Sequence, residues 1–463
     1  MQCHPELSFW RPTADRISEG SSHEIMFIAR TKIFWLCMLA ITASTFADDF
    51  DLPELPATKD APEQSDYDGP INFKPIEATS VSNKAPQDTP AGVVSMKIPE
   101  SLNRPLKVGV YTGVKELYWV AAGDTGTIHL TATGNKVNIS WPGKPTSDSK
   151  LDIAAGDACI KLAPTQKELA TACYPGTFHI TAKGGLLNAI NEVDVEEYLR
   201  GVVPYEIGKL DSSRFSALES QAVAARTYAY KHFGSRESLG FDVYADTKDQ
   251  VYKGINSATP LTDSAVKATA GIVMTYNGEF IIAYYHSTCG GETETLATWG
   301  KPDLPYLQSK PDLREDGTPW CNESSYSKWE RKFTDKEILT LFKKNGKEAN
   351  AKVPDFKKLK SITVKDTLKS GRILTLAVDT DKGKFEVRGD KVRWLFKKAG
   401  TILPSSFFRI EHKKGEWVVT GKGFGHGVGM CQMGVRARAA AGQDFTTILT
   451  HYYPGITLER FEK

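Results

Sequence analysis

Glycine occupies every second position of one stretch near the C-terminal end, Gly421-Lys-Gly-Phe-Gly-His-Gly-Val-Gly429. A backbone without side chains at alternate positions can bend sharply and approach a ligand or another chain segment closely. The spacing differs from that of a phosphate-binding P-loop, and the Lys-Ser/Thr pair of such a loop is absent. The stretch therefore predicts a closely packed loop around His426, with helices following over 431–441 and 445–452.

Length and charge set the first limits on what this chain can be. Its 463 residues are enough for two or more domains. Lys and Arg number 58 against 56 Asp and Glu, so no strong field favours nucleic acid as a partner. Beyond the N-terminal region, no apolar run is long enough to span a bilayer, so we expect no membrane span in the mature chain.

Residues 26–47 have the order of a secretory signal peptide. Two basic residues precede an apolar run over 33–41, and small residues ending at Ala47 suit a signal peptidase. Residues 1–25 do not fit this pattern, so we expect Met26 to be the true start. The expected location is the periplasm, the cell envelope or the cell exterior.

The segment 48–105 is rich in proline, acidic and hydroxyl residues, which predicts a disordered tether. Short alternating runs broken by Gly, Asn and Asp predict a small β-rich unit over 106–180. Residues 181–463 mix helical and strand patterns, with a Lys-rich, β-rich insert over about 325–415. The expected class is α+β, with the β-rich unit followed by a mixed α/β core.

Two local patterns place candidate residues within that core. Alanine-rich helical spacing predicts a helix over about 213–232, and a second helix is expected over 263–270 with Thr262 as its N-cap. Asn277-Gly278 lies between two β-rich runs, which is a strong hairpin signal. We therefore expect His286 to end a hairpin strand.

Glu206 is a single carboxylate in an apolar run just before the first of these helices. Burial beside apolar groups would raise its pKa and let it hold a proton near neutral pH. The alternative is that Glu206 lies in the first turn near a helix start, where negative charge is favoured. The residues alone leave both interpretations open.

Five cysteines would remain after removal of residues 1–47. Cys159 and Cys173 are close in sequence and could form a disulfide that closes one short hairpin-like segment. Cys289 and Cys321 could form a second disulfide across a longer loop. That arrangement leaves Cys431 unpaired, and sequence alone does not fix the connectivity.

A metal site is a further possibility among these residues. His286, Cys289, His426 and Cys431 could suggest zinc, but their spacings match no usual Cys/His pattern and Cys289 has a candidate disulfide partner. We therefore expect no metal cofactor.

Five motifs occur in a fixed order and together resemble the stage II sporulation protein D (SpoIID/LytB) family. They span residues 196–206, 218–228, 262–271, 285–291 and 425–434, and Tyr452-Tyr-Pro-Gly455 follows. The resemblance covers roughly residues 106–463. Some relatives carry a Cys-x-x-x-His-Cys zinc loop where this chain has 245–252 without Cys or His, and many have Ser at the position of Cys431.

The resemblance implies a peptidoglycan lytic transglycosylase that cleaves between N-acetylmuramic acid and N-acetylglucosamine, on glycan stripped of stem peptides, with Glu206 as acid and base. It also implies that a set of motif residues lies near the substrate groove. These are Gln221, Arg226, Tyr252, His286, Ser287, His426 and Gln432.

Three other functions stay open at this point. A glycoside hydrolase would need a second carboxylate, for which Asp246 is a candidate. A non-catalytic glycan-binding module could act as the enhancer of a cell-wall amidase, which would then be a partner. A zinc amidase is disfavoured by the missing ligand loop.

Overall fold

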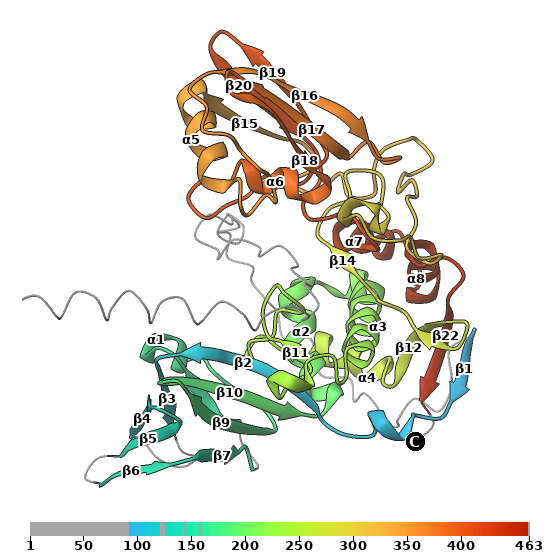
Figure 1. Ribbon diagram of the computed structural model, residues 1–463. Coiled ribbons are helices and arrows are strands. Elements are labelled where there is room, and N and C mark those ends of the chain that lie inside the picture. The colour runs from blue at the N-terminus through green and yellow to red at the C-terminus, as the bar shows by residue number, and fades with distance from the viewer. Residues whose placement is uncertain (1–91, 121–125, 142–143, 157–158, 462–463) are drawn as a thin grey trace, which may run out of the picture. The chain divides into compact units, whose positions relative to one another are not determined.

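The computed structural model describes residues 92–120, 126–141, 144–156 and 159–461. The expected signal peptide and residues 48–91 of the expected tether lie outside this part of the chain. Helices and strands are both abundant and occupy largely separate stretches of sequence, so the fold is α+β, as the sequence predicts (Figure 1). No helix within the described residues is long and apolar enough to cross a membrane.

The N-terminal β-rich unit contains two five-stranded sheets. One has the order β11-β2-β10-β9-β7 and the other β6-β5-β4-β3-β8. Their bounds are β2 Leu106–Val114, β3 Glu116–Val120, β4 Thr127–Thr133, β5 Lys136–Trp141, β6 Lys144–Asp148, β7 Lys150–Ala154, β8 Lys161–Ala163, β9 Thr177–Lys183, β10 Leu186–Val193 and β11 Val243–Tyr244. The unit extends beyond the expected boundary at residue 180, because β10 pairs antiparallel with both β2 and β9.

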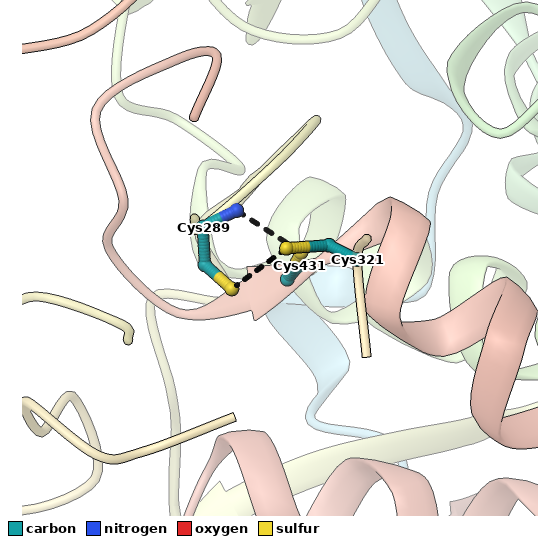
Figure 2. A group of neighbouring side chains, drawn as sticks. All are labelled: Cys289, Cys321 and Cys431. Atoms are coloured by element: carbon teal, nitrogen blue, oxygen red, sulfur yellow. Dashed lines mark hydrogen bonds between the residues drawn. The ribbon is translucent and has the colours of Figure 1, made fainter. Parts of the chain in front are cut away.

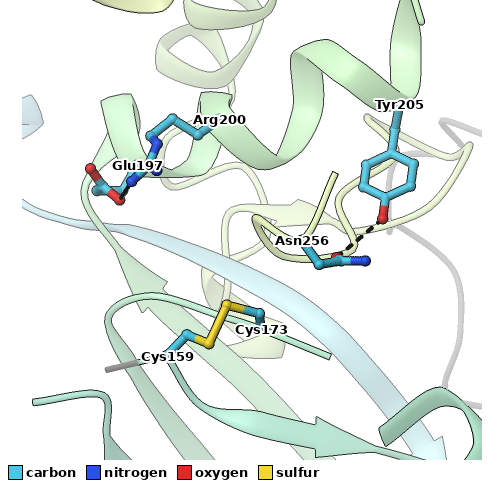
Figure 3. Close-up of a disulfide and its surroundings, with 6 residues drawn as sticks. All are labelled: Cys159, Cys173, Glu197, Arg200, Tyr205 and Asn256. Atoms are coloured by element: carbon cyan, nitrogen blue, oxygen red, sulfur yellow. Dashed lines mark hydrogen bonds and ion pairs between the residues drawn. A yellow bond between two sulfur atoms is a disulfide. The ribbon is translucent and has the colours of Figure 1, made fainter. Parts of the chain in front are cut away.

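A disulfide joins Cys159 to Cys173 in this unit, as expected from their spacing (Figure 3). The short helix α1 (Gln166–Leu169) lies between the two cysteines, and Thr165 caps it. The backbone carbonyl of Cys173 accepts a hydrogen bond from Ile255, so the disulfide-bonded segment also contacts the loop that follows Tyr252.

A four-stranded sheet has the order β1-β22-β12-β13, with bounds β1 Val93–Met96, β12 Ile272–Tyr276, β13 Glu279–Phe280 and β22 Thr457–Phe461. The tether prediction is wrong for the segment around β1, because this strand pairs in parallel with β22. The predicted hairpin turn is present, with φ of 52° at Asn277 and 79° at Gly278. After Phe280 the chain leaves the hairpin, so the expected strand does not continue to His286.

Five helices contribute buried apolar side chains to the core of the mixed α/β region. Their bounds are α2 Val195–Glu206, α3 Phe215–Lys231, α4 Pro260–Ala268, α7 Gln432–Ala440 and α8 Phe445–Tyr452. Helix α3 is almost wholly buried, since its alanines allow neighbouring segments to pack closely on several sides. Helix α4 starts earlier than predicted, because Thr259 is its N-cap and Thr262 completes the capping box.

The insert has a hydrophobic core of its own, formed by residues from Trp329 to Val419. Two three-stranded sheets, of order β15-β20-β19 and β16-β17-β18, surround this core with two helices (orange in Figure 1). The bounds are β15 Trp329–Thr334, α5 Asp335–Asn345, β16 Leu359–Thr367, β17 Ile373–Thr380, β18 Gly383–Arg388, α6 Val392–Leu395, β19 Phe408–Lys413 and β20 Glu416–Gly421. Thr334 and Glu337 form a capping box at the start of α5.

Candidate functional site

Glu206 is the last residue of α2. The interpretation that it lies near a helix start is therefore wrong, since the helix ends here and Gly208 follows with φ of 84°. A helix C-terminus carries partial negative charge and disfavours a carboxylate. The local backbone thus favours the neutral acid at this position.

The carboxyl of Glu206 is held from two sides. The backbone N–H of Val251 donates to Oε1 at 2.7 Å, and Nε2 of Gln432 lies 3.4 Å from Oε2. The Val251 segment can come this close because Gly201 lacks a side chain: a Cβ there would lie 2.6 Å from the ring of Tyr252 and 2.7 Å from the carbonyl oxygen of Gly254.

Burial raises the pKa of Glu206 to about 7, and the hydrogen bonds from Val251, Gln432 and Tyr285 oppose that rise in part. A carboxyl with this pKa is protonated in roughly half of the molecules at neutral pH. It can therefore donate a proton and accept one back under the same conditions.

Glu206 opens into a pocket with apolar and polar walls. Its lining consists of Glu206, Tyr228, Thr247, Asp249, Val251, Ala283, Tyr284, Tyr285, His286, Ser287, Arg393, Phe424, Gly425, His426 and Gln432. Four of the residues expected from the sequence, besides Glu206, are among them: His286, Ser287, His426 and Gln432. The motifs that carry them lie far apart in sequence and meet at this pocket.

One wall of the pocket is built around a parallel bridge between two short strands. Strand β14 (Tyr285–His286) pairs with β21 (Met430–Cys431), which places Ser287 and Gln432 at neighbouring strand ends. The rings of His286 and His426 lie 5.5 Å apart, centroid to centroid. The wall therefore presents two imidazoles, a hydroxyl and an amide.

Both histidines of this wall are neutral at physiological pH. Burial lowers the pKa of His426 to about 4 and that of His286 well below its ordinary value. Nδ1 of His286 lies 3.2 Å from the carbonyl of Val428, so it carries the proton and leaves Nε2 as an acceptor. That Nε2 is buried and has no hydrogen-bond partner in the described structure. It is available to a ligand donor.

A second carboxylate, Asp249, also lines the pocket but is fully engaged. It accepts hydrogen bonds from the Tyr228 hydroxyl at 2.8 Å and the Tyr244 backbone at 2.7 Å, and it pairs with Arg236 at 2.9 Å. Its side chain is completely buried. Asp246, the candidate for a second catalytic carboxylate, does not belong to the pocket lining.

Gln221 lies behind the pocket lining on α3. Its Oε1 is 3.4 Å from Nε2 of Gln432, which therefore stands between Gln221 and Glu206. Nε2 of Gln221 is buried and has no partner among the described residues. The position of Gln221 suits orientation of Gln432 better than direct contact with a ligand.

The structure does not bring Arg226 and Tyr252 to this pocket. Arg226 is completely buried, forms a two-pronged ion pair with Glu196 at 2.8 and 2.7 Å, and donates to the carbonyls of Val266 and Ile272. Tyr252 donates its hydroxyl to Asn191 at 2.9 Å. The polar groups of both residues are therefore used in contacts within the core, and we assign them a structural role.

The glycine-rich loop packs against other segments as closely as the sequence predicts. A Cβ on Gly427 would lie 2.4 Å from the guanidinium carbon of Arg372, and one on Gly429 would lie 2.1 Å from the carbonyl oxygen of Tyr284. Both glycines have positive φ, 88° and 72°. Arg372 is thereby buried beside the loop, where it donates to the carbonyls of Cys289 and Glu292.

Sequence reasoning missed several residues of the lining. Tyr228 falls within the motif over 218–228, but nothing in that motif singles it out as a pocket residue. Val251 acts through its backbone N–H, so it leaves no side-chain signal. Arg393 comes from the insert, where it pairs with Asp390 at 3.0 Å. No local pattern in the insert indicates that it reaches the pocket.

Cys289 and Cys321 do not form the disulfide considered from the sequence. Their sulfurs lie 3.5 Å apart, and both thiols are free and buried together with that of Cys431. Cys431 is the N-cap of α7 and directly precedes Gln432, the first residue of that helix. The three cysteines thus form one cluster behind the pocket wall (Figure 2).

Comparisons with known proteins agree with this arrangement of motifs. A family profile described as stage II sporulation protein (SpoIID) matches residues 183–276, and a domain of unknown function (DUF8618) matches residues 320–429. The second match coincides with the insert that has its own core.

Three relatives extend the likeness beyond these segments. An uncharacterized protein of Brachyspira hyodysenteriae is 30% identical over 293 residues, which cover 63% of this chain and 73% of that protein. The amidase enhancer of Bacillus subtilis is 30% identical over 298 residues, covering 57% of this chain and only 40% of the enhancer. Stage II sporulation protein D of Bacillus amyloliquefaciens is 28% identical over 332 residues, covering 68% and 85%.

Proposed function

The chain belongs to the stage II sporulation protein D family, and from that premise we propose that it is a lytic transglycosylase of peptidoglycan. It cleaves the bond between N-acetylmuramic acid and N-acetylglucosamine in glycan strands stripped of stem peptides. The single observation that carries the proposal is a carboxyl with a pKa of about 7 in a pocket whose other described carboxylate is fully paired.

The reaction needs one group that gives and then takes a proton. Neutral Glu206 protonates the glycosidic oxygen, and the bond to the muramic acid C1 breaks through an oxocarbenium-like state. The resulting carboxylate removes the proton from the C6 hydroxyl, whose oxygen bonds to C1 and closes a 1,6-anhydro ring. Glu206 regains its proton, and no water is consumed.

A hydrolase would require a second carboxylate to activate water or to attack C1. Asp249 is the nearest candidate in the lining, but its ion pair with Arg236 and its two other hydrogen bonds leave it no free role. The engaged state of Asp249 favours an intramolecular nucleophile, such as the C6 hydroxyl, over a water molecule.

The remaining pocket groups suit recognition of sugar hydroxyls and acetamido groups. Nε2 of His286 is a buried acceptor without a partner, and Gln432 offers an amide beside the acid. Both histidines are uncharged, which suits an uncharged sugar ring better than a phosphate or carboxylate ligand.

A second function is favoured by one relative. Because the Bacillus subtilis relative bears the name amidase enhancer, this chain could bind glycan without cleaving it and promote a separate cell-wall amidase. In that case the same pocket would hold the strand, and the carboxyl of Glu206 would contribute binding only. Either function requires export, which the signal pattern over 26–47 supports.

The test is mass spectrometry of denuded glycan strands incubated with the protein lacking residues 1–47. Wild type should produce 1,6-anhydro-muramic ends, and Glu206→Gln should reduce their rate of formation at least about 100-fold, in line with loss of a general acid. Glu219→Gln is the matched control. Burial also raises the pKa of Glu219, to about 6, but Glu219 lies outside the pocket lining.

Other outcomes separate the alternatives. Reducing ends in place of anhydro ends would identify a hydrolase. Strands that bind equally to wild type and Glu206→Gln but stay intact would identify the binding module.

A further inference from the structure

Three cysteines from distant parts of the chain meet behind the pocket wall. Cys289 follows the His286-Ser287 wall, Cys321 lies just before the insert, and Cys431 is the N-cap of α7. All three are completely buried, and their sulfurs lie within 4.8 Å of one another. Figure 2 shows the three side chains converging on one point.

The spacing of the sulfurs matches a metal site. A tetrahedral zinc ion with Zn–S bonds of about 2.3 Å holds its sulfurs about 3.8 Å apart. The sulfurs of Cys289 and Cys321 are 3.5 Å apart, and all three sulfurs lie within 4.8 Å of one another. A disulfide would use only two thiols, whereas three lie together here.

Backbone donors surround these sulfurs as they do in thiolate sites. The N–H groups of Cys289 and Gly434 point to Sγ of Cys431 at 3.2 and 3.4 Å, and that of Gly291 points to Sγ of Cys289 at 3.3 Å. Such donors stabilise negative charge on sulfur and orient metal ligands. The N-terminal end of α7 at Cys431 acts in the same direction.

A buried carboxylate lies beside the cysteine cluster. Oδ2 of Asp312 lies 3.3 Å from Sγ of Cys289, and it accepts a hydrogen bond from the Tyr452 hydroxyl at 2.9 Å. Its other oxygen pairs with Arg438 at 2.7 Å. A buried carboxylate held in this way can orient the metal-binding thiolates from outside the coordination shell, and the arginine offsets its negative charge.

We propose that Cys289, Cys321 and Cys431 bind one zinc ion, with the carboxylate of Asp312 beside these ligands. This assignment reverses the expectation from the sequence that no metal is bound. The set considered there, His286, Cys289, His426 and Cys431, matches no usual Cys/His spacing, and Cys289 had a candidate disulfide partner. Binding releases the thiol protons and forms three Zn–S bonds without any change of oxidation state.

The site would fix the geometry of the pocket. Cys431 directly precedes Gln432 in sequence, and the bridge between β14 and β21 pairs His286 with Cys431. One ion would therefore join both strands of this wall to the segment around Cys321. Zinc here has a positioning role, because the three sulfurs are buried and none belongs to the pocket lining.

The test measures metal in the full chain, purified without chelators. We expect about one equivalent of zinc by plasma mass spectrometry, and cobalt added to the metal-free protein should give thiolate-to-cobalt charge-transfer absorption with the visible bands of a tetrahedral site. Cys431→Ser should weaken cobalt binding at least about 100-fold, and Asp312→Asn about 10- to 100-fold. A variant with Cys159→Ser and Cys173→Ser should bind the metal as wild type does.

Three results would overturn the proposal, and the first two use wild-type protein, so they do not depend on the folding of a variant. The first is a folded protein that takes up neither zinc nor cobalt while alkylation finds all three thiols free. The second is a Cys289–Cys321 disulfide in the protein as isolated, detected by peptide mass spectrometry. The third is metal bound with equal affinity by wild type and Cys431→Ser, which would likewise exclude this site.

Discussion

The backbone N–H of Val251 donates to Oε1 of Glu206 at 2.7 Å, although 45 residues of sequence separate them. Because Oε1 already accepts this hydrogen bond, the proton of the neutral acid belongs on Oε2. Gln432 donates to Oε2 only at the long distance of 3.4 Å. The backbone contact thus selects which oxygen of the acid carries the proton.

The rate of glycan cleavage should fall as pH rises above about 7. Glu206 must be protonated to start the reaction, and its pKa is about 7. Since His426 has a pKa of about 4 and His286 is also lowered, neither histidine titrates in this window. Initial rates between pH 5 and 9 should show kcat/KM decreasing about tenfold per pH unit on the alkaline side. A rate that still increases from pH 7 to 9 contradicts the assignment.

Glu206→Gln should make the fold more stable at neutral and alkaline pH. The folded-state pKa is raised from 4.5 to about 7, so the contribution of Glu206 to stability is full below pH 4.5 and is lost as pH rises through 7. Glutamine removes this loss. Denaturant unfolding at pH 8 should give a gain on the order of 1–3 kcal/mol, and the gain should vanish near pH 4. An equal gain at both pH values would exclude burial of the carboxyl as its cause.

Gly201→Ala should lower both stability and activity. Alanine favours a helix by up to about 1 kcal/mol over glycine, but its Cβ would meet Tyr252 and the Gly254 carbonyl at under 3 Å. Overpacking of this kind costs about 1–3 kcal/mol. The displaced segment would withdraw the Val251 donor and raise the pKa of Glu206 further. Thermal unfolding and the pH profile should therefore shift together, and a stabilised variant with an unchanged profile would contradict the role given to Gly201.

Arg226→Met should destabilise the fold without raising KM for glycan. Arg226 is buried against Glu196 and two backbone carbonyls, so its removal leaves several groups unpaired, at a cost of about 3 kcal/mol or more. Thermal unfolding measures the loss, and kinetics on the folded fraction measure KM. Glu196→Gln, which keeps a hydrogen-bonding partner for Arg226, should lose less. Unchanged stability with a raised KM would contradict this structural role and indicate that Arg226 contacts the substrate.

The strongest local patterns of the sequence predicted their elements well. The alanine-rich spacing indicated α3, the Asn277-Gly278 pair indicated the β12–β13 hairpin, and the limits of α8 agree with those predicted. Each of these elements is specified by neighbours within one or two turns of chain. The glycine-rich loop was also predicted correctly, because its spacing excludes side chains wherever it contacts other segments.

Other features depend on contacts that no local pattern contains. Helix α2 was missed because Gly201, Pro204 and adjacent valines are weak helix formers, and burial of its apolar face overrides that preference. The orientation of Arg226 into the core depends on Glu196, thirty residues away. The thiol cluster depends on three distant segments meeting, so pairing cysteines by spacing found Cys159–Cys173 and failed for Cys289 and Cys321.

Strand β22 lies between β1 and β12 and pairs with both. A ribosome makes β1 and β12 before β22, because both precede it in the sequence. Until β22 is made, the two earlier strands have no common neighbour, and each keeps an open edge. This sheet therefore cannot close before β22 is made, and loss of Thr457–Phe461 would leave β1 without its partner.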